Sequence, residues 1–238
     1  NKNTERLIKL GAKVFFGHHK SNLKKATMIV MSSAVKKNNK EFKAAKSRKI
    51  PIFKRGEMLA NIVALKKNIV ITGSHGKTTT TSLVSKILSD QKLDPTIING
   101  GVINSFKSNA KLGKGEWAIL EADESDGSFL NFPINFSVVT NIDKEHIDFY
   151  KNFKNLKNSF LYFLNKTPSL GKAFICIDDQ EIKKIIPKIK NKNFLTYGFS
   201  KDANFQILNP VYKKQLSSFD LKISRPNLKK AVIKNIKL

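Results

Sequence analysis

The chain has 238 residues, of which 40% are hydrophobic and 26% are charged. This composition supports a packed core and excludes a disordered chain. The longest apolar runs have the length of a strand and fall far short of the roughly 20 residues of a membrane-spanning helix, which excludes a membrane protein. The single cysteine, Cys176, cannot form an internal disulfide. Together with the lack of a signal-peptide pattern, it predicts a cytoplasmic location.

The net charge of +26 is of the size that nucleic-acid-binding proteins carry. Nearly all of it comes from lysines that are spread along the chain. Proteins that recognise bases or bind phosphates with two hydrogen bonds favour arginine, because its planar guanidinium group matches the geometry of these groups. The only arginines are Arg6, Arg48, Arg55 and Arg225. We therefore expect a solvated lysine surface, with neither nucleic acid nor a membrane as partner.

The first part of the chain alternates between helical and strand-like patterns, beginning with a helical pattern at residues 4–10. Short apolar runs predict strands at residues 12–16, 28–32 and 50–53. Apolar residues at helical spacing predict helices at residues 37–49 and 57–65.

The same alternation continues from residue 68 onward. The expected strands are residues 68–72, 95–99, 117–122, 137–142, 173–177 and 194–198. The expected helices are residues 77–90, 153–164 and 181–189. The inner face of the first of these helices is expected to carry Leu83, Val84, Ile87 and Leu88. After Asp202, short alternating strands at 204–208 and 218–223 predict an antiparallel edge.

Uniformly apolar strands that alternate with helices are typical of a parallel sheet covered on both faces, so the sequence predicts the α/β class. A short basic linker, Lys66-Lys67-Asn68, separates two such runs. We therefore place one domain at residues 1–67 and a second at residues 68–238.

A glycine-containing loop follows the apolar strand at 68–72 and leads into the helix at 77–90. Backbone amides in such a loop turn toward phosphate oxygens, and the helix N-terminus adds partial positive charge. The loop has two residues between its glycines, instead of the four of the common phosphate-binding motif. Its context predicts a site for a nucleoside triphosphate. The expected nucleotide-binding residues are Gly73, Ser74, His75, Gly76, Lys77, Thr78 and Thr79.

Within this loop, Lys77 is placed to reach the β and γ phosphates, and the hydroxyl of Thr78 is placed to bind Mg²⁺. A cluster of four acids, within residues 121–126, lies at the end of the strand that begins at Trp117. Ligands of open parallel sheets bind beyond the carboxyl ends of strands. Glu121, the last strand residue, is therefore the best candidate for a carboxylate near the metal.

His146 follows the end of another strand of the same sheet. A lone histidine is more often structural than a ligand. Its position in the same layer as the loop and the acidic cluster favours a place in the site. His18, His19 and His75 carry less weight, and His75 needs no catalytic role within the loop.

Taken together, these segments resemble the Mur ligase family. The matching stretches are residues 73–80, 94–96, 99–101, 121–130, 139–142, 146–148, 178–179 and 196–200, with further matches at 32–34 and 55–60. The resemblance implies a partial Rossmann-like domain for a UDP-sugar, followed by a P-loop, mostly parallel-sheet ATPase domain. It also implies that the first strand of the family and its third domain lie outside this chain. We therefore expect an internal segment of a longer protein, inactive by itself.

Within the family, the sequence is most similar to members that join L-alanine to the lactyl carboxylate of UDP-N-acetylmuramate. The resemblance implies ATP and Mg²⁺ as cofactors and an acyl-phosphate intermediate. It implies catalytic roles for Lys77, Glu121 and His146, with Lys77 on the phosphates. Thr78 and Glu121 would bind one Mg²⁺ and His146 a second. The weaker substrate-binding candidates are Ser32, Ser33, Asp123 and Asp126.

Two other functions are alternatives. A recycling ligase that adds a preformed peptide to UDP-N-acetylmuramate shares the phosphate loop, although Ser125 and Phe129-Leu130 favour the L-alanine enzymes. A basic P-loop NTPase acting on nucleic acid would fit the charge, but it needs an arginine-rich or aromatic groove that the sequence does not show. The sequence indicates no protein partner.

Overall fold

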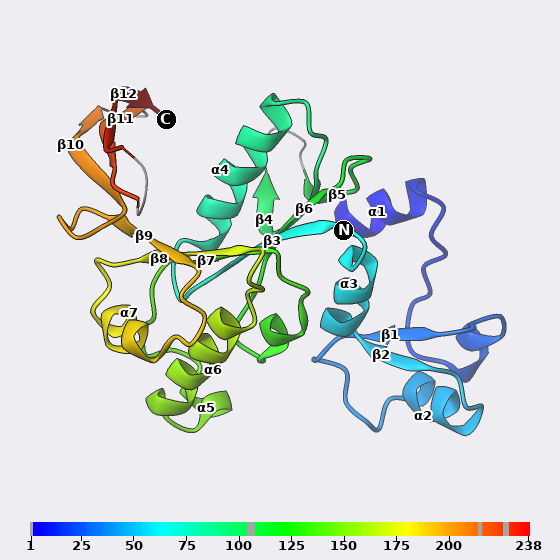
Figure 1. Ribbon diagram of the computed structural model, residues 1–238. Coiled ribbons are helices and arrows are strands. Elements are labelled where there is room, and N and C mark those ends of the chain that lie inside the picture. The colour runs from blue at the N-terminus through cyan, green and yellow to red at the C-terminus, as the bar shows by residue number, and fades with distance from the viewer. Residues whose placement is uncertain (1, 104–107, 214–215, 226–228) are drawn as a thin grey trace. The chain divides into compact units, whose positions relative to one another are not determined.

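The structure, a computed structural model, describes residues 2–103, 108–213, 216–225 and 229–238. It divides into two compact units, Asn1–Leu59 and Ala60–Leu238 (Figure 1). The division falls inside helix α3 (Arg55–Val63). The domain boundary that the sequence places after residue 67 stays a prediction.

The first unit contains a small parallel sheet and short helices. Strands β1 (Ile29–Met31) and β2 (Ile52–Lys54) pair in parallel. The helices before α3 are α1 (Lys2–Lys9), η1 (Lys20–Leu23) and α2 (Lys40–Ser47). The side chain of Asn39 caps α2 by accepting hydrogen bonds from two backbone amides, and Ala45 is the buried residue of that helix. The predictions of these two strands and of α2 and α3 are confirmed.

The strand predicted at residues 12–16 is wrong. These residues are exposed and form no ladder, and Phe16 is 91% exposed. A strand needs a neighbour for its backbone hydrogen bonds. In the described part of this unit, β1 and β2 pair only with each other.

The second unit is built on a mixed sheet of ten strands within the described residues, in the order β12-β11-β10-β9-β8-β7-β3-β6-β4-β5. Its strands are β3 (Lys67–Thr72), β4 (Thr96–Ile103), β5 (Ser108–Lys111), β6 (Trp117–Glu121), β7 (Phe136–Val139), β8 (Lys172–Cys176), β9 (Phe194–Gly198), β10 (Phe205–Lys213), β11 (Leu216–Ile223) and β12 (Ala231–Lys237). The pairs from β4 across to β10 are parallel. β5 pairs antiparallel at one edge, and β11 and β12 at the other. The predicted α/β class and the antiparallel edge are confirmed.

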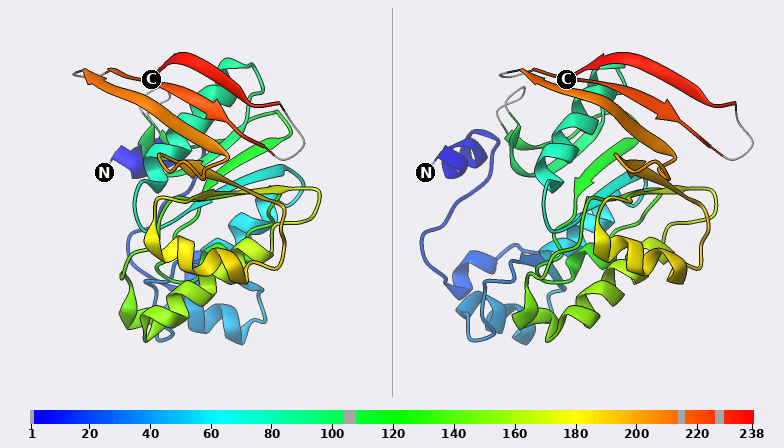
Figure 2. Two further views of the ribbon diagram at one scale, coloured as in Figure 1. Left: turned by 60° about the vertical axis from the view of Figure 1, so that its left-hand side comes forward. Right: turned by 90° about the vertical axis from the view of Figure 1, so that its left-hand side faces the viewer.

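Helices cover both faces of the central strands. Figures 1 and 2 show α4 on one face, and α6 and α7 on the other. The helices of this unit after α3 are α4 (Lys77–Asp90), η2 (Ser128–Asn131), α5 (Ile147–Tyr150), α6 (Phe153–Asn165), α7 (Gln180–Ile185) and η3 (Ile186–Lys188). On the α4 face, the core includes Ile71, Ile97 and Ile119. On the other side, Phe129 packs against the rings of two phenylalanines of α6. Among the described residues, no helix combines the length and the apolar character that crossing a membrane requires.

The bounds of α4 agree with the prediction, but its buried face is shifted. Val84 and Leu88 pack against the core, whereas Leu83 is 41% exposed and Ile87 55% exposed. The buried stripe continues instead through the small polar residues Thr81 and Ser85. Residues three and four apart share a helix face, and small side chains there let the helix approach the sheet closely. The inner-face prediction is therefore wrong for two of its four residues.

Candidate functional site

The phosphate loop joins β3 to α4 through two glycines with positive φ, 138° at Gly73 and 79° at Gly76. Glycine adopts such angles without strain. A Cβ at Gly73 would lie 2.1 Å from Oγ1 of Thr140, so this position also has no room for a side chain. Gly76 is the N-cap of α4 and has no side chain to cap it. The amides of the first turn are therefore available to an anion.

Lys77, the first residue of α4, folds back over the loop. Its Nζ donates hydrogen bonds to the carbonyl oxygens of Gly73, at 2.6 Å, and Ser74, at 3.1 Å. It also lies 2.9 Å from Oε2 of Glu124 in an ion pair. The positive charge is thus held at the mouth of the loop, where phosphates would bind.

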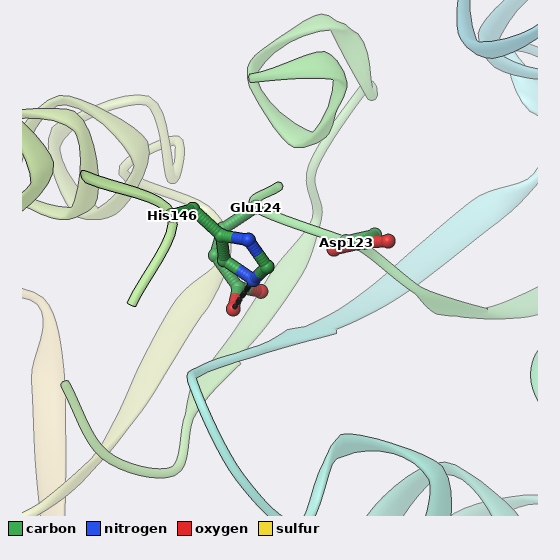
Figure 3. A group of neighbouring side chains, drawn as sticks. All are labelled: Asp123, Glu124 and His146. Carbon is green, nitrogen blue, oxygen red and sulfur yellow. Dashed lines mark ion pairs between the residues drawn. The ribbon is translucent and has the colours of Figure 1, made fainter. Parts of the chain in front are cut away.

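Glu124 is the central acidic group of this site and is fully buried. Burial raises the pKa of its carboxyl, and the hydrogen bond from Lys77 opposes that rise. Oε1 of Glu124 lies 3.6 Å from Nε2 of His146. Figure 3 shows the imidazole of His146 over this carboxylate. With Asp123, the two residues place three possible ligand atoms within 4.8 Å of one another.

Glu121 and Thr78 form a second pair of oxygen ligands. The hydroxyl of Thr78 donates a hydrogen bond of 2.9 Å to Oε1 of Glu121. The amide of Gly100 donates to Oε2 of the same carboxylate at 2.6 Å. A Cβ at Gly100 would lie 2.7 Å from Oε1, and one at Gly101 would lie 2.9 Å from Cγ2 of Thr78. The two glycines of β4 therefore make room for this pair.

Helix α5 supports Glu124 from both of its ends. His146 is its N-cap, with φ of 55° in the left-handed region. At the other end, the hydroxyl of Tyr150 donates a hydrogen bond of 2.5 Å to the backbone carbonyl of Glu124. Burial raises the pKa of Tyr150, and the charge of Glu124 adds to that rise, so the phenol stays a proton donor. One short helix thus holds both the side chain and the backbone of Glu124.

The structure brings together most of the residues that the sequence singles out, but in two groups. Thr78 lies with Glu121, while His146 lies with Glu124 and Asp123. His75 and Thr79 are exposed, and Ser74 is buried.

The other predicted substrate-binding residues make local contacts. Asp126 accepts a hydrogen bond from the amide of Ser128. Ser32 accepts one from the amide of Ala34, and it follows β1 in the first unit together with Ser33. These contacts assign no substrate role to the three residues.

The sequence places Glu124 in the acidic cluster with Asp123 and Asp126, where any of the three could orient metal-bound water or the substrate ammonium, and it does not separate their roles. Because ligands of parallel sheets bind beyond the carboxyl ends of strands, the sequence favours Glu121, the last residue of β6. After it the chain turns, with Asp123 accepting a hydrogen bond from the amide of Ser125. This turn directs Glu124 inward. The four acids within residues 121–126 indicate an acidic site in the sequence. Which of their side chains is buried depends on the geometry of the turn.

The comparisons with known proteins identify the family of the chain. Residues 71–236 match the Mur ligase middle domain, and residues 1–67 match the Mur ligase family catalytic domain. The chain belongs to the Mur ligase family. The resemblance expected from the sequence is confirmed, as is the fold class that it implies.

Relatives of this Mur ligase chain include two UDP-N-acetylmuramate–L-alanine ligases. The protein of Pelagibacter ubique is 58% identical over 238 residues, which cover 100% of this chain and 51% of the relative. The protein of Parvibaculum lavamentivorans is 45% identical over 93% of this chain and 45% of its own length. The chain therefore spans about half the length of the curated relatives that it matches.

Two solved Mur ligase structures share the fold. UDP-N-acetylmuramate-alanine ligase of Thermotoga maritima has a TM-score of 0.80 at 22% identity and covers 98% of this chain and 52% of its own. The UDP-N-acetylmuramate:L-alanyl-gamma-D-glutamyl-meso-diaminopimelate ligase of Neisseria meningitides has a TM-score of 0.81 at 22% identity, over 91% of this chain and 71% of its own.

Proposed function

We propose that this chain is part of an ATP-dependent ligase that joins L-alanine to the lactyl carboxylate of UDP-N-acetylmuramate. This reaction belongs to the synthesis of peptidoglycan precursors in the cytoplasm. The observation that carries the substrate assignment is the 58% identity to an L-alanine ligase along the whole chain. The site geometry supports the reaction class, since Lys77 of the phosphate loop pairs with the carboxylate of Glu124, and the next residue, Thr78, donates a hydrogen bond to the carboxylate of Glu121.

The proposed reaction begins with transfer of the γ-phosphoryl group of ATP to the lactyl carboxylate, which gives an acyl phosphate and ADP. The amine of L-alanine then attacks the acyl carbon, and the tetrahedral intermediate collapses to the amide and phosphate. Negative charge develops on the phosphoryl oxygens, so catalysis depends on cations held in position. Lys77 supplies one of these charges, with its ammonium fixed by two loop carbonyls.

The residues of the site fit Mg²⁺, which supplies further positive charge to the phosphates when it is bound. Thr78 and Glu121 would hold one ion, because their hydroxyl and carboxylate oxygens are adjacent. Asp123, Glu124 and His146 would hold a second ion, with two carboxylates and one imidazole within 4.8 Å. In the folded chain, Lys77 neutralises part of the charge that Glu124 carries.

The test is phosphate release from ATP by the complete gene product. UDP-N-acetylmuramate is supplied alone, with L-alanine, or with the tripeptide L-alanyl-γ-D-glutamyl-meso-diaminopimelate. Release that requires both UDP-N-acetylmuramate and L-alanine supports the proposal. Release that requires the tripeptide would instead favour the recycling ligase. Release that responds only to polynucleotide would overturn the ligase assignment.

A further inference from the structure

The phosphate loop is held in place by a segment that lies far from it in the sequence. This bracing segment, Thr140–Asp143, directly follows β7, which lies beside β3 in the sheet. The amide of Ser74 donates to the carbonyl of Asn141 at 3.1 Å. The amide of Asp143 donates to Oγ of Ser74 at 2.8 Å. The two peptide segments are therefore hydrogen-bonded to each other beyond the ends of their strands.

The side chain of Asn141 makes the most specific of these contacts. Its Oδ1 accepts a hydrogen bond of 2.7 Å from the amide of His75. Its Nδ2 donates one of 3.0 Å to the carbonyl oxygen of the same residue. The hydroxyl of Thr140 donates to that carbonyl oxygen as well, at 2.7 Å. One primary amide thus satisfies both backbone polar groups of His75, as a neighbouring strand would.

These contacts decide which amides of the loop can meet a phosphate. The amides of Ser74 and His75 already donate to Asn141. The groups left for an anion are those of Gly76 and of the first turn of α4. The amide of Gly76 belongs to the same peptide group as the carbonyl of His75, which Asn141 holds. The direction of this amide, and of the amides of the helix turn after it, therefore depends on Asn141.

The short loop explains why such a brace is needed. With two residues between its glycines, the loop is shorter than the common motif with four, so fewer residues are available to hold it from within. A loop that must become ordered when its ligand arrives loses affinity to conformational entropy. Bonds from the bracing segment fix the loop before the nucleotide binds.

We propose that Asn141 is a positioning residue for the triphosphate, acting through His75 to aim the amides of Gly76 and of the first turn of α4. The inference rests on the proposed function, because it assumes that the loop binds ATP. It goes beyond that function by assigning a role to a residue that touches the loop and not the substrate.

The decisive variant is Asn141→Asp, which keeps the size and the acceptor but places an oxygen against the carbonyl of His75. We expect the Kd for MgATP to rise about tenfold or more, because a favourable hydrogen bond becomes a repulsion. Asn204→Asp is the matched control. Asn204 accepts a hydrogen bond from the amide of Thr196 and donates one to the carbonyl of Ser224, with no contact to the loop.

Both variants are made in the complete gene product. Unfolding by urea and MgATP binding by titration calorimetry are measured for each. The proposal expects similar losses of stability but a weaker Kd only for Asn141→Asp. Equal effects of the two variants on the Kd, or an unchanged Kd for Asn141→Asp, would overturn it.

A second variant covers the case in which Asn141→Asp does not fold. Thr140→Val removes one of the two donors to the carbonyl of His75 and keeps the shape of the side chain. We expect a smaller rise in the Kd, about threefold, since Asn141 still donates there. An unchanged Kd for Thr140→Val in that case counts against the proposal. If the unaltered protein does not bind MgATP, the proposed function fails first and the inference fails with it.

Discussion

The ammonium of Lys77 lies 2.9 Å from the carboxylate of Glu124, whose side chain is fully buried. Two opposite charges therefore meet at the phosphate loop, one on α4 and one on the turn after β6. Breaking a buried ion pair from one side leaves the other charge without compensation. Both residues are thus expected to affect stability as well as activity.

Lys77→Ala should abolish ligase turnover, because no other side chain holds positive charge on the two loop carbonyls that Lys77 contacts among the described residues. It should also lower the free energy of unfolding by about 3–5 kcal/mol, since Glu124 loses its partner. Phosphate release and urea unfolding measure the two effects. Adding Glu124→Gln to this variant should restore part of the stability but none of the turnover. Normal turnover in Lys77→Ala would refute its assigned role.

The raised pKa of Glu124 predicts a pH dependence of stability. Between the ordinary value of 4.5 and the raised value, the folded chain keeps a proton that the unfolded chain has released. The free energy of unfolding therefore falls as pH rises through this window. Glu124→Gln removes the titration, so its stability should change less with pH above 4.5.

Urea unfolding at a series of pH values checks this prediction. The control is Glu116→Gln, which changes an exposed carboxylate. It should keep the slope of the unaltered protein. Parallel slopes for Glu124→Gln and the unaltered protein would contradict the burial argument.

His146→Ala should raise the Mg²⁺ concentration needed for half-maximal activity, because the cluster with Asp123 and Glu124 loses its nitrogen ligand. We expect a change of about tenfold, as for the loss of one metal ligand or its support. His19→Ala, an exposed histidine in the first unit, is the control and should leave the titration unchanged. An unaltered Mg²⁺ requirement in His146→Ala would return His146 to a structural role.

Tyr150→Phe should disturb Glu124 without removing any metal ligand. The variant removes the phenol that donates to the carbonyl of Glu124, which keeps the amide of Gly127 as its other donor, so we expect a loss of about 1 kcal/mol in stability. The released turn should also raise the Mg²⁺ requirement, by less than His146→Ala does. Tyr162→Phe, on the exposed face of α6, is the matched control. A loss of stability with an unchanged Mg²⁺ titration would show that Tyr150 supports the fold alone.

The sequence predicts the strand, loop and helix that form this site well, because the patterns that indicate them lie within one short stretch of the chain. A buried strand, two glycines and an amphipathic helix follow one another, and the bounds of α4 agree with the prediction. The sequence places Thr78 and Glu121 at the same edge of the parallel sheet, because strand ends and helix starts meet there, and the structure brings their side chains into hydrogen-bond contact.

The remaining features depend on contacts between distant segments. Asn141 acts on His75 across 66 positions, and nothing in the pattern around Asn141 indicates that its amide would meet that peptide. Glu124 depends on the turn after β6, which directs it inward, whereas Asp123 stays exposed. Leu83 was expected inside because an apolar stripe does not reveal which of its two sides faces the sheet.

The carboxylate of Glu121 joins three elements. It extends from β6, accepts a hydrogen bond from the hydroxyl of Thr78 on α4 and accepts another from the amide of Gly100 on β4. Both of its oxygens are therefore fixed by the fold itself. At the proposed cation site, the entropy of ordering this ligand is lost when the chain folds and not when the ion binds. The affinity for the cation should accordingly follow the local stability of the contact between β4 and β6. Mild denaturant that loosens this edge of the sheet would weaken cation binding before the chain unfolds as a whole.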